Sequence, residues 1–97
     1  MPSPRYQVYN LREIYHELGE YQFKVVLSPR FYRSGHDFRV EMADSANRPM
    51  RHRVDVWGRK INVSFTIDEG VADGVFHADI VRKDKTLVRL TGWCIKP

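Results

Sequence analysis

Apolar and polar residues alternate along most of the chain after residue 20. Successive side chains of a β-strand point to opposite faces, so this alternation is typical of strands that bury one face. The clearest case is residues 61–68, in which every second residue, from Ile61 to Ile67, is apolar. The pattern predicts six strands, at residues 21–28, 37–43, 53–58, 61–68, 75–81 and 86–95.

The segments between these runs are short and rich in residues that favour turns, such as Gly58-Arg59-Lys60. Short strands joined by turns predict an all-β domain. An antiparallel β-sandwich of six or seven strands is the favoured architecture, and a small barrel is the alternative.

The first twenty residues follow a different pattern. Their apolar positions recur at helical spacing, at Leu11, Ile14, Tyr15 and Leu18. Asn10 is a suitable N-cap and Gly19 a suitable stop, so the pattern predicts a helix over residues 11–18 after an irregular tail, residues 1–10. A helix of two turns is marginal alone. It must therefore pack on its own sheet or on a neighbouring subunit.

The length of 97 residues and the apolar content of 42% fit one globular domain, residues 11–97 including the helix. A single cysteine excludes an internal disulfide and a four-cysteine zinc site. No apolar run has the length of a membrane span, and the start has no signal-peptide pattern. We therefore expect cytoplasmic synthesis without a secretion signal.

The charge is concentrated in one stretch. The chain has a formal net charge of +4, and residues 48–60 contain a single acidic residue, Asp55. A basic stretch of this kind suits binding to nucleic acid or to acidic protein surfaces. Its basic residues are Arg48, Arg51, Arg53, Arg59 and Lys60.

The basic stretch contains the first candidate surface. The predicted strand places Arg51, Arg53, Asp55 and Trp57 on one face. An exposed Trp among Arg side chains is typical of a protein interface, and a solvated face whose Arg stems cover the Trp is the alternative. A register shift of one residue would move Trp57 into the core.

The second candidate surface is Arg30-Phe31-Tyr32-Arg33, on a predicted loop. Arginines beside aromatic residues are typical of protein interfaces, and they also bind single-stranded nucleic acid. The structural alternative is that Phe31 or Tyr32 closes one end of the sandwich.

Catalytic and metal-binding patterns are weak. The four histidines lie in different predicted elements, and only His77 and Asp79 share a strand face, where a solvated polar face is the simpler interpretation. Cys94 is interpreted as a small buried hydrophobe rather than a nucleophile. We therefore expect a protein that is not an enzyme and has no metal, cofactor or small-molecule substrate.

The run Gly74-Val75-Phe76-His77-Ala78 resembles the start of strand F in immunoglobulin domains. Phe76 stands where those domains have the corner tyrosine, and Ala78 stands where they have the second cysteine. The resemblance implies an immunoglobulin-like sandwich without the inter-sheet disulfide.

Residues 61–95, and above all the string DGVFHADIVRKDKTLVRLTG, resemble immunoglobulin-like modules of bacteriophage structural proteins. Those modules share a G-x-[FY] strand, a charged hairpin and L-x-R-L-x-G. The resemblance implies a tail, neck, baseplate or decoration component of a virion.

Two functions follow from the sequence. The first is a structural or assembly module that contacts other proteins or copies of itself. The alternative is a small nucleic-acid-binding β-domain, in which Tyr32 stacks on bases and the cations of Arg51, Arg53, Arg59 and Lys60 contact phosphates. Basic residues gathered on one face with aromatic residues would favour nucleic acid, and dispersed basic residues would favour protein contacts.

Overall fold

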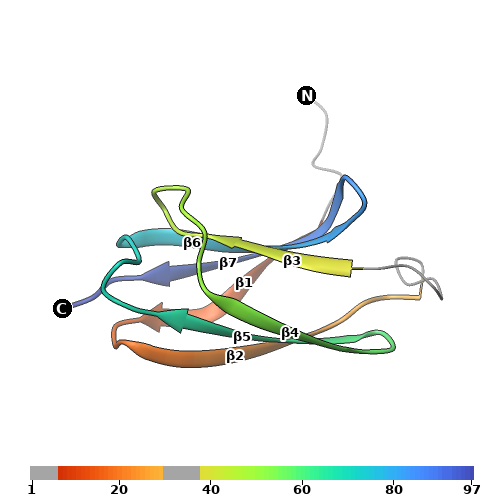
Figure 1. The fold of residues 1–97 in the computed structure, drawn as a ribbon, viewed down its shortest axis with the longest axis horizontal. Helices are drawn as coiled ribbons and strands as arrows, with labels where there is room; N and C mark the ends of the chain where they lie inside the picture. Colours follow the sequence, from red (N-terminus) through yellow and green to blue (C-terminus); the bar gives the residue numbers. More distant parts are fainter. Residues whose placement is uncertain (1–6, 30–37) are drawn as a thin grey trace.

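The computed structural model describes residues 7–29 and 38–97, which contain seven strands in two sheets and no helix (Figure 1). The strands are β1 (Gln7–Tyr15), β2 (Gly19–Val26), β3 (Phe38–Ala43), β4 (His52–Trp57), β5 (Lys60–Ile67), β6 (Gly74–Arg82) and β7 (Lys85–Cys94). The strand order is β1-β7-β6-β3 in the four-stranded sheet and β2-β5-β4 in the three-stranded sheet.

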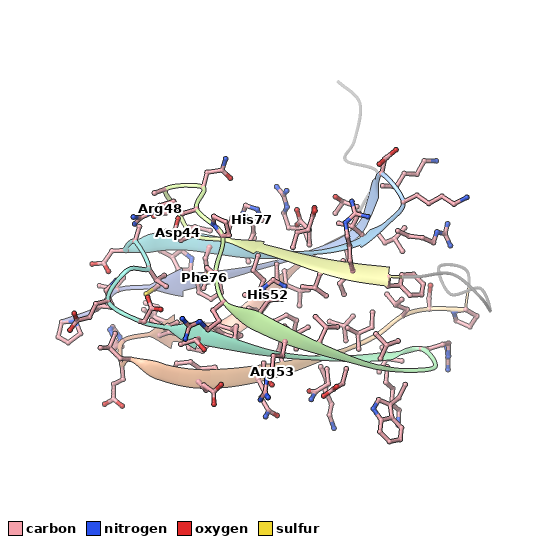
Figure 2. All side chains as sticks on the ribbon, in the orientation of Figure 1. Asp44, Arg48, His52, Arg53, Phe76 and His77 are labelled. Atoms are coloured by element: carbon pink, nitrogen blue, oxygen red, sulfur yellow. The ribbon has the colours of Figure 1, made fainter. Side chains whose placement is uncertain are left out.

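The two sheets face each other across one apolar core (Figure 1). Phe65 of β5 and Phe76 of β6 are almost fully buried, and their ring centroids lie 5.5 Å apart. Figure 2 shows Phe76 in the layer between the sheets. The expected all-β class is therefore confirmed, and the two packed layers agree with a sandwich.

The six strands predicted from alternation are confirmed, with every boundary within two residues. In β5, the alternating apolar residues from Ile61 to Ile67 are at most 1% exposed, while the polar residues between them remain partly exposed. Alternation identified these strands because each has one face against the core.

The predicted helix over residues 11–18 is wrong. The segment belongs mostly to β1, which pairs in parallel with β7 and begins at Gln7, inside the expected tail. Leu11 and Tyr15 pack against the core, whereas Ile14 and Leu18 are 45% and 51% exposed. The apolar residues therefore do not form one buried stripe.

Sheet pairing explains why the strand is favoured over the helix. A two-turn helix would satisfy few of its own backbone groups, whereas β1 pairs with the edge of β7 that β6 leaves open. The ladder shifts register between Asn10 and Ile14. Tyr15 then reaches the core, with its ring centroid 5.6 Å from that of Phe65. We had expected an antiparallel sandwich. The parallel pairing of β1 with β7 makes the four-stranded sheet a mixed one.

A glycine makes room for the central aromatic residue. Gly92 of β7 lies opposite Phe76 of β6, and a Cβ atom at Gly92 would come within 2.6 Å of the Phe76 ring. Because Phe76 has no exposed surface, its ring has little freedom to move away. The absence of a side chain at Gly92 is therefore a packing requirement.

Asp44 organises the loop that leads from β3 of one sheet to β4 of the other (Figure 2). Its buried carboxylate accepts hydrogen bonds from the backbone N–H groups of Ala46, Arg48 and Ala72, at 2.9–3.0 Å. Burial opposes ionisation, but these bonds and the Arg48 guanidinium outweigh it and lower the pKa of Asp44 below 3.8. The ionised carboxylate therefore fixes the crossing between the sheets.

Candidate functional site

The outer face of the three-stranded sheet brings the basic stretch together with a tryptophan. Asn62 of the central strand β5 lies between Lys24 of β2 and Asp55 of β4 in the ladder. Two pairs further along, and so on the same face, Lys60 of β5 lies opposite Trp57 of β4. Side chains from all three strands therefore meet near the β4–β5 turn.

The turn itself sets this arrangement. Trp57 and Lys60 are the last pair of the hairpin, so Gly58 and Arg59 form a two-residue loop. Gly58 has a φ of 61°, which a residue with a side chain rarely adopts, and glycine at this first loop position is typical of a type II′ turn. The short turn holds Trp57 and Lys60 across from each other on the outer face.

These residues surround a shallow hollow of about 260 Å³, which we call the Trp57 hollow. The Trp57 side chain is 75% exposed, the largest exposed fraction among the exposed large apolar residues of the described chain. The Asn62 Oδ1 atom is buried and accepts no hydrogen bond from any described residue. The lining residues are Lys24, Asp55, Trp57, Lys60 and Asn62.

The face of β4 that was predicted from the sequence to be exposed is exposed in the structure. Arg53, Asp55 and Trp57 are all exposed on the outer side of β4, and Figure 2 shows Arg53 pointing away from the core. Arg51 is exposed just before β4, and its carbonyl oxygen accepts a hydrogen bond from the Thr66 N–H. The register on which the Trp57 argument depends is therefore confirmed.

The remaining basic residues of the stretch lie in three different surroundings. Lys60 lines the Trp57 hollow. Arg59 lies in the turn, where its Nη1 donates to the Leu27 carbonyl at 3.4 Å. Arg48 lies in the Asp44 loop, where its Nη2 donates to the Gly70 carbonyl at 2.9 Å. Arg48 therefore has a structural role and is not part of the hollow.

Sequence reasoning missed two members of the hollow, Lys24 and Asn62. Both lie on predicted strands, but only the register of β2, β5 and β4 shows that they flank Asp55. The outward position of Asn62 within the alternation of β5 was a usable signal. The other predicted surface, Arg30, Phe31, Tyr32 and Arg33, lies outside the described residues.

The outer face of the four-stranded sheet has a second exposed tryptophan. Ile14 of β1, Trp93 of β7 and Val75 of β6 are neighbours in the ladder and are 45%, 50% and 38% exposed. Ile95, two residues after Trp93, is 41% exposed. We call these four residues the Trp93 patch. The sequence did not identify it, because the last predicted strand is apolar on both faces.

The charges on this second face are paired. Arg89 of β7 makes a bidentate ion pair with the buried carboxylate of Asp79 on β6, at 2.7 and 2.8 Å. Arg39 and Glu41 of β3 form a further pair at 3.4 Å. The ion pairs lie on the same outer face as the Trp93 patch, four ladder pairs or more along from Trp93.

The same pairing bears on the metal interpretation of His77 and Asp79. The His77 Nε2 atom lies 4.0 Å from Asp79 Oδ2, but Arg89 already occupies both carboxylate oxygens. Within residues 7–29 and 38–97, no three His, Cys, Asp or Glu side chains are grouped to hold a metal ion.

Cys94 has no exposed surface, and burial is the main reason why the pKa of its thiol is raised above 9.0. The side chain packs in the core and stays protonated at neutral pH, as expected of a small hydrophobe. The described segments also contain no helix with the length and apolar character needed to cross a membrane.

Comparison with known protein families found no matching family model, and comparison with curated proteins found no similar sequence. The likeness to phage modules thus remains a prediction from residues 61–95 alone.

Proposed function

We propose that the chain is an immunoglobulin-like β-sandwich that acts without catalysis, as an assembly module contacting other proteins or further copies of itself. The strand order supports the first part of this proposal. If β2 to β7 are taken as strands B to G, the sheets have the orders B-E-D and C-F-G of immunoglobulin domains, with β1 beside G. Gly74 to Ala78 then begin strand F, as the sequence resemblance implies.

The Trp93 patch is the observation that carries the proposed function. Three of its apolar residues are ladder neighbours from three strands, and the fourth, Ile95, directly follows the end of β7. Contiguous exposed apolar surface is uncommon on proteins that act alone and typically marks an interaction site. A Trp between aliphatic neighbours, on a face whose charged side chains are paired with one another, matches the anatomy of a protein interface.

A virion component is the most specific form of this function, and it depends only on the resemblance of residues 61–95. The expected interface at Arg51, Arg53 and Trp57 remains a prediction. Their exposed positions permit contact with a partner.

The experiment compares wild type with Trp93→Ala. Sedimentation velocity over a concentration series measures self-association, and capture from nuclease-treated lysate of the producing cells measures association with other proteins. We expect the wild type to associate in one of these assays and Trp93→Ala to lose that association while remaining folded. Association that is unchanged in a folded Trp93→Ala variant, or absent from both assays, would contradict the proposal.

A further inference from the structure

We propose that the outer face of the three-stranded sheet binds single-stranded nucleic acid, with one base stacked on Trp57 and its edge in the Trp57 hollow. This site is separate from the Trp93 patch, because the two tryptophans lie on the outer faces of different sheets. The proposal therefore goes beyond assembly and can fail without affecting it.

Trp57 supplies the stacking surface. Its side chain is 75% exposed and makes no aromatic contact with any described ring. Unstacked bases of a single strand pack on such exposed rings, and every base has a suitable face. The hairpin turn fixes the backbone of Trp57, so the backbone does not have to become ordered when a base stacks.

The hollow beside Trp57 supplies hydrogen-bonding groups for a base edge. Asn62 Oδ1 is buried without a donor, which leaves the cost of removing it from water uncompensated. Asp55 accepts no hydrogen bond from another described residue through its carboxylate. Both groups are acceptors, and the exocyclic amines of adenine, cytosine and guanine are donors. The hollow of about 260 Å³ is suited to one planar base.

Cations surround this hollow. Lys24 and Lys60 line it, Arg53 precedes it on β4, and none of the three makes an ion pair with a described residue. They are therefore free to contact phosphates, and in the proposed complex the lining side chains move so that the base edge reaches Asn62. On the whole face, including Arg51, the cations outnumber the carboxylates of Glu20 and Asp55.

The same observations favour nucleic acid over a protein at this site. Phosphates attract cations that have no partner of their own, and they occur at regular intervals that a row of cations can follow. Apart from Trp57, the residues that line the hollow are charged or carry an amide. Val26, which lies opposite Lys60 in the ladder and is 59% exposed, is an apolar neighbour outside the lining. From the sequence we expected that basic residues gathered on one face with an aromatic residue would favour nucleic acid. Arg53, Lys60 and Trp57 have this arrangement.

Fluorescence anisotropy with labelled single strands of about twelve nucleotides, in homopolymers of T, C and A, tests the proposal directly. We expect binding that weakens between about 50 and 200 mM salt, with a log–log slope near −2 for about three phosphate contacts. Trp57→Ala should weaken binding by about 5- to 100-fold. Lys60→Gln should reduce the slope by about 0.7.

Two matched variants serve as controls. Trp93→Ala removes the exposed indole of the opposite face, and Lys85→Gln removes the same charge as Lys60→Gln from the first residue of β7, in the other sheet. Both should bind like wild type. No binding at low salt, or equal losses in Lys85→Gln and Lys60→Gln, would overturn the proposal. A protein partner that depends on Trp57, with no binding of oligonucleotides, would overturn it in favour of a protein interface.

Discussion

The two outer faces of this molecule each expose a tryptophan, and the neighbours of that tryptophan differ. Trp93 lies in a row of exposed aliphatic side chains, and the arginines further along the same face are paired with carboxylates. Trp57 lies among lysines and an arginine that have no such partners in the described chain, above an amide oxygen without a donor. An exposed aromatic residue therefore does not specify a partner by itself. The charge state and hydrogen bonding of its neighbours favour a protein in one case and a polyanion in the other.

Both outer faces depend on the packing of the two sheets against each other. The prediction with the largest expected effect on the free energy of unfolding tests that packing. Gly92→Ala places a methyl group against the Phe76 ring, and we expect it to lower the free energy of unfolding by about 3 kcal/mol in a urea titration. Both faces should then lose binding together. In a Phe76→Leu background the same substitution should cost less, because the ring is gone. An equal cost in both backgrounds would show that the clash is not the cause.

The second prediction concerns a substitution that makes the charge of the two outer faces more similar. Asp79→Asn removes the carboxylate charge that faces Arg89 and makes the outer face of the four-stranded sheet more positive by one charge. We expect the free energy of unfolding to fall by about 2 kcal/mol, since charged hydrogen bonds are lost. We also expect weak nucleic-acid binding at low salt that no longer depends entirely on Trp57. A variant as stable as wild type would contradict the assigned strength of the pair.

The third prediction concerns the crossing between the sheets and depends on pH. The pKa of Asp44 is lower in the folded than in the unfolded chain, so its stabilisation is present above pH 3.8 and lost as the pH falls further. Asp44→Asn should cost about 1–2 kcal/mol at pH 6. The difference between wild type and variant in urea titrations should shrink below pH 3.8. A difference that stays constant down to pH 2 would contradict a role for the ionised form.

The smallest expected effect separates binding from stability at the Trp57 hollow. Asn62→Leu removes the buried acceptor without a donor, so we expect the free energy of unfolding to stay within about 0.5 kcal/mol of wild type or to rise. Binding of C and A homopolymers should weaken toward that of T, because the group that accepts from their exocyclic amines is lost. Unchanged preference among the three homopolymers would restrict the site to stacking and phosphate contacts.

Much of this fold was predictable, because it follows from local alternation. The six strands β2 to β7 each have one face against the core, and period-two patterns record that directly. β1 was not predictable in the same way. Its apolar residues coincide with helical spacing, and the partner that makes it a strand, β7, lies about 80 residues away in the sequence.

The candidate sites also include features that a single strand predicts and features that depend on pairing between distant strands. The exposed face of Arg53, Asp55 and Trp57 could be predicted, since it lies within one strand. Lys24 and Asn62 required the register of three strands. The Trp93 patch could not be predicted, because β7 is apolar on both faces. The β6–β7 ladder shifts register between Ile80 and Val81, and the consecutive residues Leu87 and Val88 are both buried there.

The parallel pairing of β1 with β7 has a mechanical consequence. The first residue of β1 pairs with Val88 and its last residue with Cys94, so the ladder runs in the same direction on both strands. The chain enters β1 at one end of this ladder and leaves β7 at the other (Figure 1). A force that pulls the two ends of the chain apart would slide the strands past each other and load their hydrogen bonds together. A module joined into a longer assembly through its ends would resist extension by shear, whereas an antiparallel hairpin pulled from its open end separates one bond at a time.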